Sequence, residues 1–421
     1  MESIFAVVDV YFSNRLGADA VATVGLTESM LTILYAMAMG LSIGAMALVA
    51  WRIGEKAPDR AARVAVQAIL LGLIVSLPIA VCGVVFARDL LATMGGSGWV
   101  VDHGYRYAQV MLGGNAVILL LFMINAIFRG AGDAAVAMRV LWLANAINLL
   151  LCPMLMFGVG PFPRLGLVGA AVGTTIGRGV GVCYQLYCLS RGNARMTVRR
   201  EHIRLELESM LAIVKLSASA VVQMLIAMTS AVALVRIVSG FGSAAVAGYT
   251  TAFRIILFAL LPSWGMSNAG ATMVGQGLGA GKPERAERAV WLAGLYNMVF
   301  LGVVGLVFVL LSGPIIHIFT SDPEVAGHGT QCLRIVSAGF LFYAWGMVLT
   351  QAFNGAGDTF TPTIINLFCF WLWELPLAWV LAYPLGWGPT GVFASIAIAY
   401  ATLAVVSGVA FRRGTWKTRK L

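Results

Sequence analysis

Long stretches of this sequence contain no Asp, Glu, Lys or Arg. Nine such runs, each of 20 residues or more, cover residues 29–51, 64–87, 107–128, 140–163, 216–235, 255–281, 289–321, 335–357 and 375–411. An α-helix needs about 20 residues to cross about 30 Å of hydrocarbon. Each run is therefore long enough for a membrane-spanning helix, and the pattern predicts a chain that crosses a membrane many times.

Charged residues interrupt only a few of the predicted spans. Three otherwise apolar segments contain one charge each: Arg178 in residues 165–190, Arg254 in residues 244–276 and Glu374 in residues 361–383. The last of the charge-free runs divides at residues 383–389, where two prolines and two glycines interrupt the helical pattern. The count therefore reaches eleven full helices.

The start of the chain predicts a twelfth, incomplete helix. Residues 1–12 are apolar apart from Glu2 and Asp9, but a segment of this length makes only about 18 Å of helix. No basic segment or small-residue cleavage site marks it as a signal peptide. We therefore expect an all-α polytopic membrane protein of twelve helices, whose first helix begins upstream of Met1.

Composition and residue spacing exclude the soluble classes of protein. The residues AVILMFWYC make up 60% of the chain and DEKR only 11%, whereas soluble domains carry about 25% charged residues. The six cysteines lie in apolar stretches, the four histidines are scattered, and no Walker loop occurs. We therefore expect no enzyme activity and no metal or other cofactor.

The 28 Lys and Arg residues predict the orientation in the membrane. With the N-terminus placed in the cytoplasm, 20 of them fall in cytoplasmic loops or termini and four fall outside, at Arg15, Arg88, Arg106 and Arg164. The remaining four lie within helices or at helix ends. Cytoplasmic loops carry the excess of basic residues in membrane proteins, so both termini are predicted to be cytoplasmic. The same rule explains the net charge of +10 without a nucleic-acid partner.

An internal repeat divides the chain at an offset of 225 residues. Leu-Gly-Ala-Asp-Ala-Val-Ala at residues 16–22 is answered by Phe-Gly-Ser-Ala-Ala-Val-Ala at residues 241–247, and Gly-Ala-Gly-Asp occurs at 130–133 and 355–358. The same offset pairs Gly54 with Gly279, Pro58 with Pro283, Arg60 with Arg285 and Arg63 with Arg288. A later Gly-x-x-Gly pair, at residues 166 and 388, is shifted by 222.

The repeat predicts two parallel six-helix lobes related by a pseudo-twofold axis along the membrane normal, because an even number of spans leaves both copies facing the same way. We expect an N-lobe at residues 1–190, a cytoplasmic linker at 191–209, a C-lobe at 210–411 and a basic cytoplasmic tail at 412–421.

Several of these segments together resemble the multidrug and toxic compound extrusion (MATE) family. They are the first helix with Asp9, the Gly-Glu-Lys-Ala-Pro-x-Arg-Ala loop at 54–61, the Val-Gly-Gln-x-Leu-Gly-Ala-Gly-Lys-Pro loop at 274–283 and the twin Gly-Ala-Gly-Asp turns. The resemblance extends from about residue 4 to residue 411. It implies cation-coupled antiport of amphipathic, often cationic drugs, with a proton or sodium gradient as the energy source.

Ionisable side chains at membrane depth are functional candidates because burying their charge is costly. Asp9 lies in the first helix, where a carboxylate can take up a proton or sodium ion and release it when the cavity changes sides. The alternative is a structural acid paired with Arg178. The resemblance implies that Asp9 is the coupling carboxylate, since it matches the position of that acid in MATE proteins.

The fifth span departs from the family pattern. Where many relatives have Asn-x-x-x-Asp-Pro, this chain keeps Asn148 and Pro153 but has Cys152 in place of the acid. Sodium prefers hard oxygen ligands, and a thiol is a poor substitute. We therefore favour proton coupling at Asp9, with Asn148 and Thr174 as hydrogen-bonding neighbours. The alternative for Asn148 is a polar contact between helices.

Further candidates for the substrate or a secondary site lie in both lobes. The shifts of 222 and 225 residues place Glu374 opposite Cys152 or Leu149, so Glu374 is a possible C-lobe counterpart of the missing acid. An ion pair with Arg254 is the alternative. Arg178 would make an N-lobe cavity less acidic, and aromatic residues such as Tyr35 and Trp373 suit bulky lipophilic cations.

These features predict an antiporter that exports amphipathic drugs across a bacterial cytoplasmic membrane and works as a monomer. The main alternative is a lipid-linked saccharide flippase of the same broad superfamily. Such proteins use several Arg or Lys residues to hold pyrophosphate, whereas only Arg178 and Arg254 are candidates in this chain.

Overall fold

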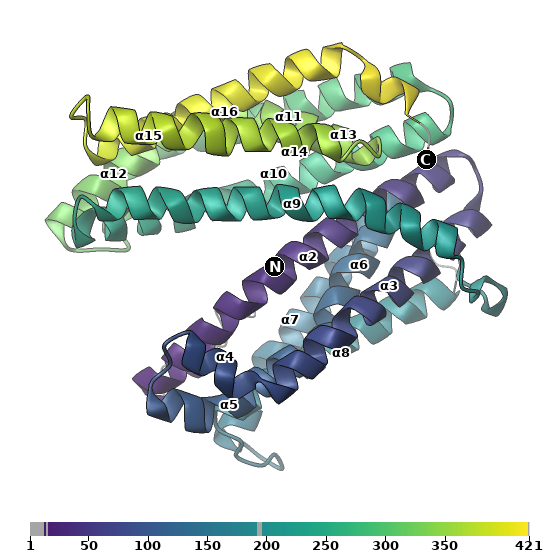
Figure 1. Ribbon diagram of the computed structural model, residues 1–421, viewed down its shortest axis with the longest axis horizontal. Helices are drawn as coiled ribbons and strands as arrows, with labels where there is room; N and C mark the ends of the chain where they lie inside the picture. Colours follow the sequence, from purple (N-terminus) through teal and green to yellow (C-terminus); the bar gives the residue numbers. More distant parts are fainter. Residues whose placement is uncertain (1–11, 14–15, 192–195, 420) are drawn as a thin grey trace. The chain divides into compact units, whose positions relative to one another are not determined.

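The computed structural model describes residues 12–13, 16–191, 196–419 and 421, and over these residues the chain is helical with no β-strand (Figure 1). The apolar runs form helices because a helix satisfies its backbone hydrogen bonds internally, as a chain in hydrocarbon requires. The described residues divide into two compact units. Unit 1 takes residues 1–49 and 57–215, and unit 2 takes residues 50–56 and 216–421.

Unit 1 contains most of α2 and the helices that follow it. Their bounds are α2 Ala18–Gly54, α3 Pro58–Val85, α4 Ala87–Thr93, α5 Gly98–Gly113, α6 Asn115–Ala131, α7 Ala134–Phe157, α8 Leu167–Arg191 and the short 3₁₀ helix η2 Arg200–His202. Within this unit α8 packs along α7, and α3 packs against α5 and α6.

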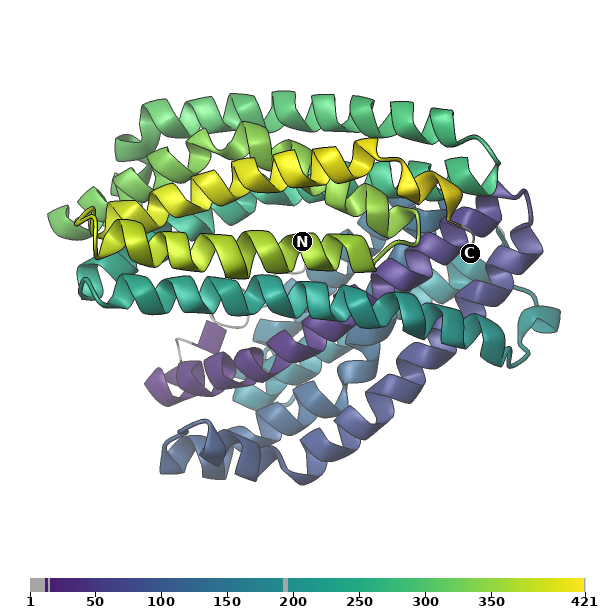
Figure 2. The same cartoon turned by 45° about the horizontal axis from the view of Figure 1, so that its top comes forward.

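Unit 2 begins within α9 and runs to the C-terminal end. Its helices are α9 Leu207–Ser239, α10 Ser243–Gly279, α11 Pro283–His317, α12 Pro323–Ala338, α13 Phe340–Gly355, α14 Phe360–Asn366, the π-helix η3 Leu367–Glu374, α15 Leu375–Ala382, α16 Pro389–Arg412 and the 3₁₀ helix η4 Thr415–Thr418. Figures 1 and 2 show α9, α15 and α16 running side by side along one direction.

The number of membrane-spanning helices agrees with the prediction. Ten described helices are long and apolar enough to cross a membrane, and the count is eleven when the bent pair of α12 and α13 is taken as one span. The two helices of this pair meet at 56°. The predicted incomplete helix at the start, with Asp9, lies outside the described residues.

Helix bounds repeat at the offset that the sequence predicts. Adding 225 to the bounds of α2 gives 243 and 279, the bounds of α10, and adding it to those of α5 gives 323 and 338, the bounds of α12. The loop between α7 and α8 covers residues 158–166, whereas the loop between α15 and α16 covers residues 383–388. This loss of three residues accounts for the change of offset from 225 to 222.

Glycines allow close helix contacts inside unit 2, which includes the last turn of α2. A Cβ on Gly54 would overlap the backbone of Gln276, and a Cβ on Gly279 would overlap the backbone of Trp51. Since 51 and 276 differ by 225, as do 54 and 279, the two glycines hold equivalent positions in the repeat. Each permits backbone contact between the end of α2 and the end of α10.

The C-terminal residues are folded onto unit 2. Trp416 is fully buried and stacks on Phe411 with ring centroids 4.7 Å apart. Lys417 forms an ion pair with Glu287 at 2.5 Å, and Arg419 forms one with Asp358 at 3.3 Å. The residues predicted as a basic tail are therefore part of the packed structure. The predicted limits of the lobes and linker remain predictions.

Candidate functional site

The first polar cluster lies in unit 1, where α7 and α8 approach closely. Three glycines spaced four residues apart, Gly169, Gly173 and Gly177, face α7, and a Cβ on any of them would crowd its backbone. Small residues at this spacing let two membrane helices meet backbone to backbone. The contact brings Thr174 of α8 to Asn148 of α7.

The predicted pair of Asn148 and Thr174 is formed. Asn148 Nδ2 donates to Thr174 Oγ1 at 2.8 Å, and both side chains are fully buried. Asn148 Oδ1 is also buried and accepts no hydrogen bond from the described residues. This amide oxygen is thus an open acceptor in the cluster.

Arg178 follows Thr174 by one helical turn and is only 2% exposed. Its guanidinium donates to the hydroxyl of Tyr35 on α2 at 3.1 Å. Glu28, also on α2 and half-buried, is close enough to interact electrostatically with Arg178. The sequence did not predict that Tyr35 and Arg178 meet, because they are 143 residues apart in the chain and come together only in the folded unit.

Cys152 lies in the same region of α7 and is fully buried. Its thiol contacts the thioether of Met156 at 3.6 Å. A thiol and a thioether are soft groups that suit sodium poorly. The predicted coupling residue Asp9 lies outside the described residues, so its relation to Cys152 remains a prediction.

The second cluster lies in unit 2 around Glu374. This carboxylate ends the π-helix η3 and is 3% exposed. Ser230 of α9 lies 3.3 Å from Glu374 Oε2 and 3.1 Å from the carbonyl oxygen of Phe370, so its hydroxyl can donate to either. No Lys or Arg in the described part of the chain forms an ion pair with Glu374.

Three buried or half-buried tyrosines surround this carboxylate. Tyr249 of α10, Tyr343 of α13 and Tyr400 of α16 all lie close enough to Glu374 to interact with its charge. The rings of Tyr343 and Tyr400 stack with centroids 4.0 Å apart. The prediction included Glu374 but missed Ser230, Tyr343 and Tyr400. The only signal for these three residues was a polar hydroxyl group within a predicted membrane-spanning segment.

One expectation about this cluster needs correction. Arg254 is exposed on α10, and the ion pairs of the described residues include none between Arg254 and Glu374, because the carboxylate points inward and the arginine outward. The alternative of a Glu374–Arg254 pair is therefore wrong. Trp373 is 41% exposed and lies outside the buried cluster, and its place in a substrate site remains a prediction.

The chemistry of the two clusters differs. The unit 1 cluster combines neutral amide, hydroxyl and thiol groups with one guanidinium, whereas the unit 2 cluster combines a carboxylate with hydroxyl groups. In the part of the chain that the structure describes, no three His, Cys, Asp or Glu side chains gather as metal ligands. The unit 2 cluster has the groups needed to hold a proton or an organic cation.

Comparisons with known proteins agree with the fold. A sequence profile of the MatE family matches residues 1–154 and 219–380. The chain is 24% identical over 411 residues to the probable multidrug resistance protein YoeA of Bacillus subtilis (strain 168), covering 96% of this chain and 88% of that protein. It is 24% identical over 421 residues to the probable multidrug resistance protein NorM of Thermotoga maritima, covering 100% of this chain and 90% of that protein.

A solved structure shows the same arrangement of the chain. The crystal structure of a MATE protein in the bent conformation matches with a TM-score of 0.91 and 24% sequence identity, covering 98% of this chain and 91% of that chain. The likeness extends over nearly the whole chain.

Proposed function

This chain belongs to the MATE family, and from that premise we propose that it exports lipophilic, cationic drugs or toxic compounds in exchange for protons by alternating access. Members of the family are multi-pass membrane transporters and not enzymes. Two relatives are named as probable multidrug resistance proteins, which supports a broad range of small organic substrates.

The observation that carries the proposal is the buried carboxylate of Glu374 in unit 2, which forms no ion pair with any described Lys or Arg. A carboxylate that is held by a hydroxyl and surrounded by tyrosines can either bind a proton or attract an organic cation. The aromatic rings add apolar and cation–π contacts that suit lipophilic cations of varied shape. A substrate and a proton that need the same carboxylate exclude each other, as antiport requires.

The proposed coupling residue of the first half is Asp9, with Asn148 and Thr174 as its polar neighbours. The open acceptor on Asn148 supports this assignment, because a protonated carboxyl group can donate a hydrogen bond to it. Proton coupling is favoured over sodium coupling because Cys152 replaces a hard ligand with a soft one.

The lipid-linked saccharide flippase remains the alternative, but the arrangement of basic residues favours it less. Of the two arginines that could hold a pyrophosphate, Arg254 is exposed on its helix, and Arg178 is hydrogen-bonded to Tyr35. A single buried guanidinium is a weak site for a group of such high negative charge.

The proposal includes the setting of the protein. We propose that it works as a monomer in a bacterial cytoplasmic membrane, the setting that its bacterial relatives suggest. The distribution of Lys and Arg in the sequence supports cytoplasmic termini.

An efflux assay in a drug-hypersensitive bacterium tests the proposal. Cells that express the chain should accumulate less ethidium than cells with an empty vector. Glu374→Gln should abolish the difference, because the amide can neither exchange a proton nor balance a cation. Glu324→Gln, at an exposed carboxylate of the same unit, should leave export unchanged. Unchanged accumulation over a broad panel of cationic dyes and drugs would count against the proposal.

A further inference from the structure

A groove opens on the surface of unit 2 between α11, α13 and α16. Its volume is about 270 Å³, and its lining is apolar except for Arg412 at one end. Val405 and Val409 of α16 form part of the lining and are 62% and 52% exposed. Exposed valines on a membrane-spanning helix face acyl chains, so the groove continues a surface that is already in contact with lipid.

Two tryptophans form the opposite wall of the groove. Trp291 of α11 and Trp345 of α13 lie with ring centroids 5.3 Å apart. Trp345 fits against α11 because Gly294 has no side chain there, and a Cβ at that position would overlap the indole ring. Trp345 Nε1 also donates to the sulfur of Met298 at 3.0 Å. The indoles are therefore fixed in place by packing.

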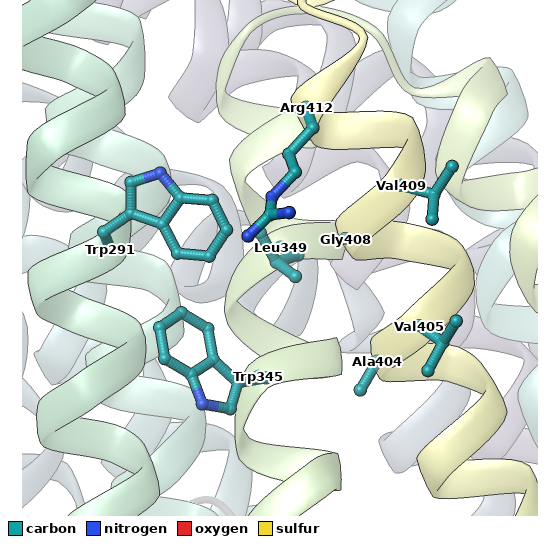
Figure 3. A pocket seen from close by; sticks show the side chains of 8 residues that line it. All are labelled: Trp291, Trp345, Leu349, Ala404, Val405, Gly408, Val409 and Arg412. Carbon is teal, nitrogen blue, oxygen red and sulfur yellow. The ribbon is translucent and has the colours of Figure 1, made fainter.

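Arg412 brings a positive charge to the end of this apolar surface. Figure 3 shows its guanidinium reaching toward Trp291, and the guanidinium carbon lies 5.9 Å from the centre of that ring. No carboxylate in the described part of the chain forms an ion pair with Arg412. The acidic groups Glu287 and Asp358 are already paired with Lys417 and Arg419.

We propose that this groove binds an anionic phospholipid. The phosphate would accept hydrogen bonds from the Arg412 guanidinium, and one acyl chain would lie along Val405, Val409 and the two indoles. The arrangement fits because arginine is a good donor to phosphate, tryptophan is common at the level of the headgroups, and basic residues near the membrane surface attract anionic lipids. The site does not depend on the proposed transport function.

Native mass spectrometry of the purified, delipidated full chain tests the site. The probes are dioleoyl phosphatidylglycerol and dioleoyl phosphatidylcholine, which share acyl chains and differ in headgroup charge. One molecule of phosphatidylglycerol should bind per chain, and it should bind more tightly than phosphatidylcholine. Arg412→Gln should weaken phosphatidylglycerol binding about fivefold, the effect of one basic residue at an anionic surface. Arg413→Gln, at the exposed neighbouring arginine, is the matched control and should change it little.

A second variant fills the groove without disturbing the fold. A Cβ on Gly408 would meet only a side-chain atom of Leu349, at 3.9 Å, so Gly408→Leu is expected to fold normally and to weaken the binding of both lipids. Equal binding of the two lipids, or equal loss in the Arg412 and Arg413 variants, would overturn the proposal. A dimer of the wild-type chain that Gly408→Leu abolishes would also overturn it, because a second copy would then occupy the groove.

Discussion

At the scale of the residue, the two halves of the chain bury different chemistry. Asn148, Thr174 and Cys152 give unit 1 a buried neutral cluster in the same pair of helices as the Arg178 guanidinium. Glu374 gives unit 2 a buried carboxylate that forms no ion pair with a Lys or Arg among the described residues. A buried carboxylate in such surroundings is costly to keep charged. It is therefore a good group for an exchange in which one positive species replaces another.

We predict that both acidic residues are needed for coupled transport. In proteoliposomes, Asp9→Asn should abolish substrate transport driven by an imposed pH gradient while the protein remains inserted, since an amide cannot exchange a proton. Glu374→Gln should be comparably severe. A milder effect would be expected if Glu374 only formed a structural ion pair with Arg254, but the two residues do not form one. Ser230→Ala removes only the hydrogen bond and should reduce the rate less.

The driving ion is varied in the same preparation. Transport should respond to pH and be indifferent to sodium at a fixed membrane potential. Sodium-driven uptake that survives Asp9→Asn would show that the ion site lies elsewhere in the chain.

At the scale of the element, the π-helix η3 changes which face of the helix is buried. A π-helix has more residues per turn than an α-helix. The side chains in and after η3 are therefore rotated about the helix axis relative to those at the corresponding positions of α7, the counterpart of this segment in the first half of the repeat. The offset of 225 pairs Glu374 with Leu149, yet Leu149 is 52% exposed whereas Glu374 is buried. The simple offset therefore does not identify the counterpart of a residue in this segment.

Close packing by glycine is a second feature of the elements. A Cβ on Gly355, at the end of α13, would overlap the backbone carbonyl of Ala271 on α10. We predict that Gly355→Ala separates these helices and lowers the thermal unfolding temperature of the detergent-solubilised protein. Gly265→Ala is the control, because Gly265 also lies on α10 and an added Cβ there has no atom within 4 Å. This variant should have an unfolding temperature equal to or slightly above that of the wild type, because alanine has a higher helix propensity than glycine. Equal melting temperatures for both variants would refute the packing argument.

The sequence predicts the existence of the helices better than their internal breaks. Eleven spans followed from the scarcity of charged residues, because the cost of burying a charge in hydrocarbon is large and local. The bend between α12 and α13 and the π-turns before Glu374 depend on how several helices pack, which no single segment encodes. For the same reason the sequence predicted Asn148, Thr174 and Glu374 as candidates but not Ser230 or the bond between Tyr35 and Arg178.

At the scale of the whole molecule, the two copies of the repeat differ in length at the junction between their last two long helices. Residues 158–166 are three residues longer than their counterpart, residues 383–388. Most of the longer loop is exposed, and it includes two prolines. A junction whose length differs between the copies is the place where the fold best tolerates added residues.

We predict that an epitope inserted between Gly160 and Pro161 leaves the protein folded. The same insertion between Gly132 and Asp133 should abolish folding, because both amides there are hydrogen-bonded to the end of α6 and Gly132 has a positive φ of 86°. Fluorescence-detected size-exclusion chromatography gives the folded fraction. Equal tolerance at the two sites would contradict this account.

The same epitope also tests the orientation of the protein in the membrane. An antibody should label the 158–166 loop on spheroplasts, whereas a tag attached to the C-terminus should be labelled only after permeabilisation. The reverse pattern would show that the termini lie outside.

The docking of residues 415–419 has a consequence for how the protein is made. During synthesis on the ribosome, α10, α11 and α13 are complete long before Trp416, Lys417 and Arg419 emerge. Until then Phe411 lacks the indole that covers it, and Glu287 and Asp358 lack their ion-pair partners. The packing of unit 2 is therefore completed only after residues 416–419 have been translated, and a nonsense codon as late as position 416 would give cellular proteases an incomplete protein to remove.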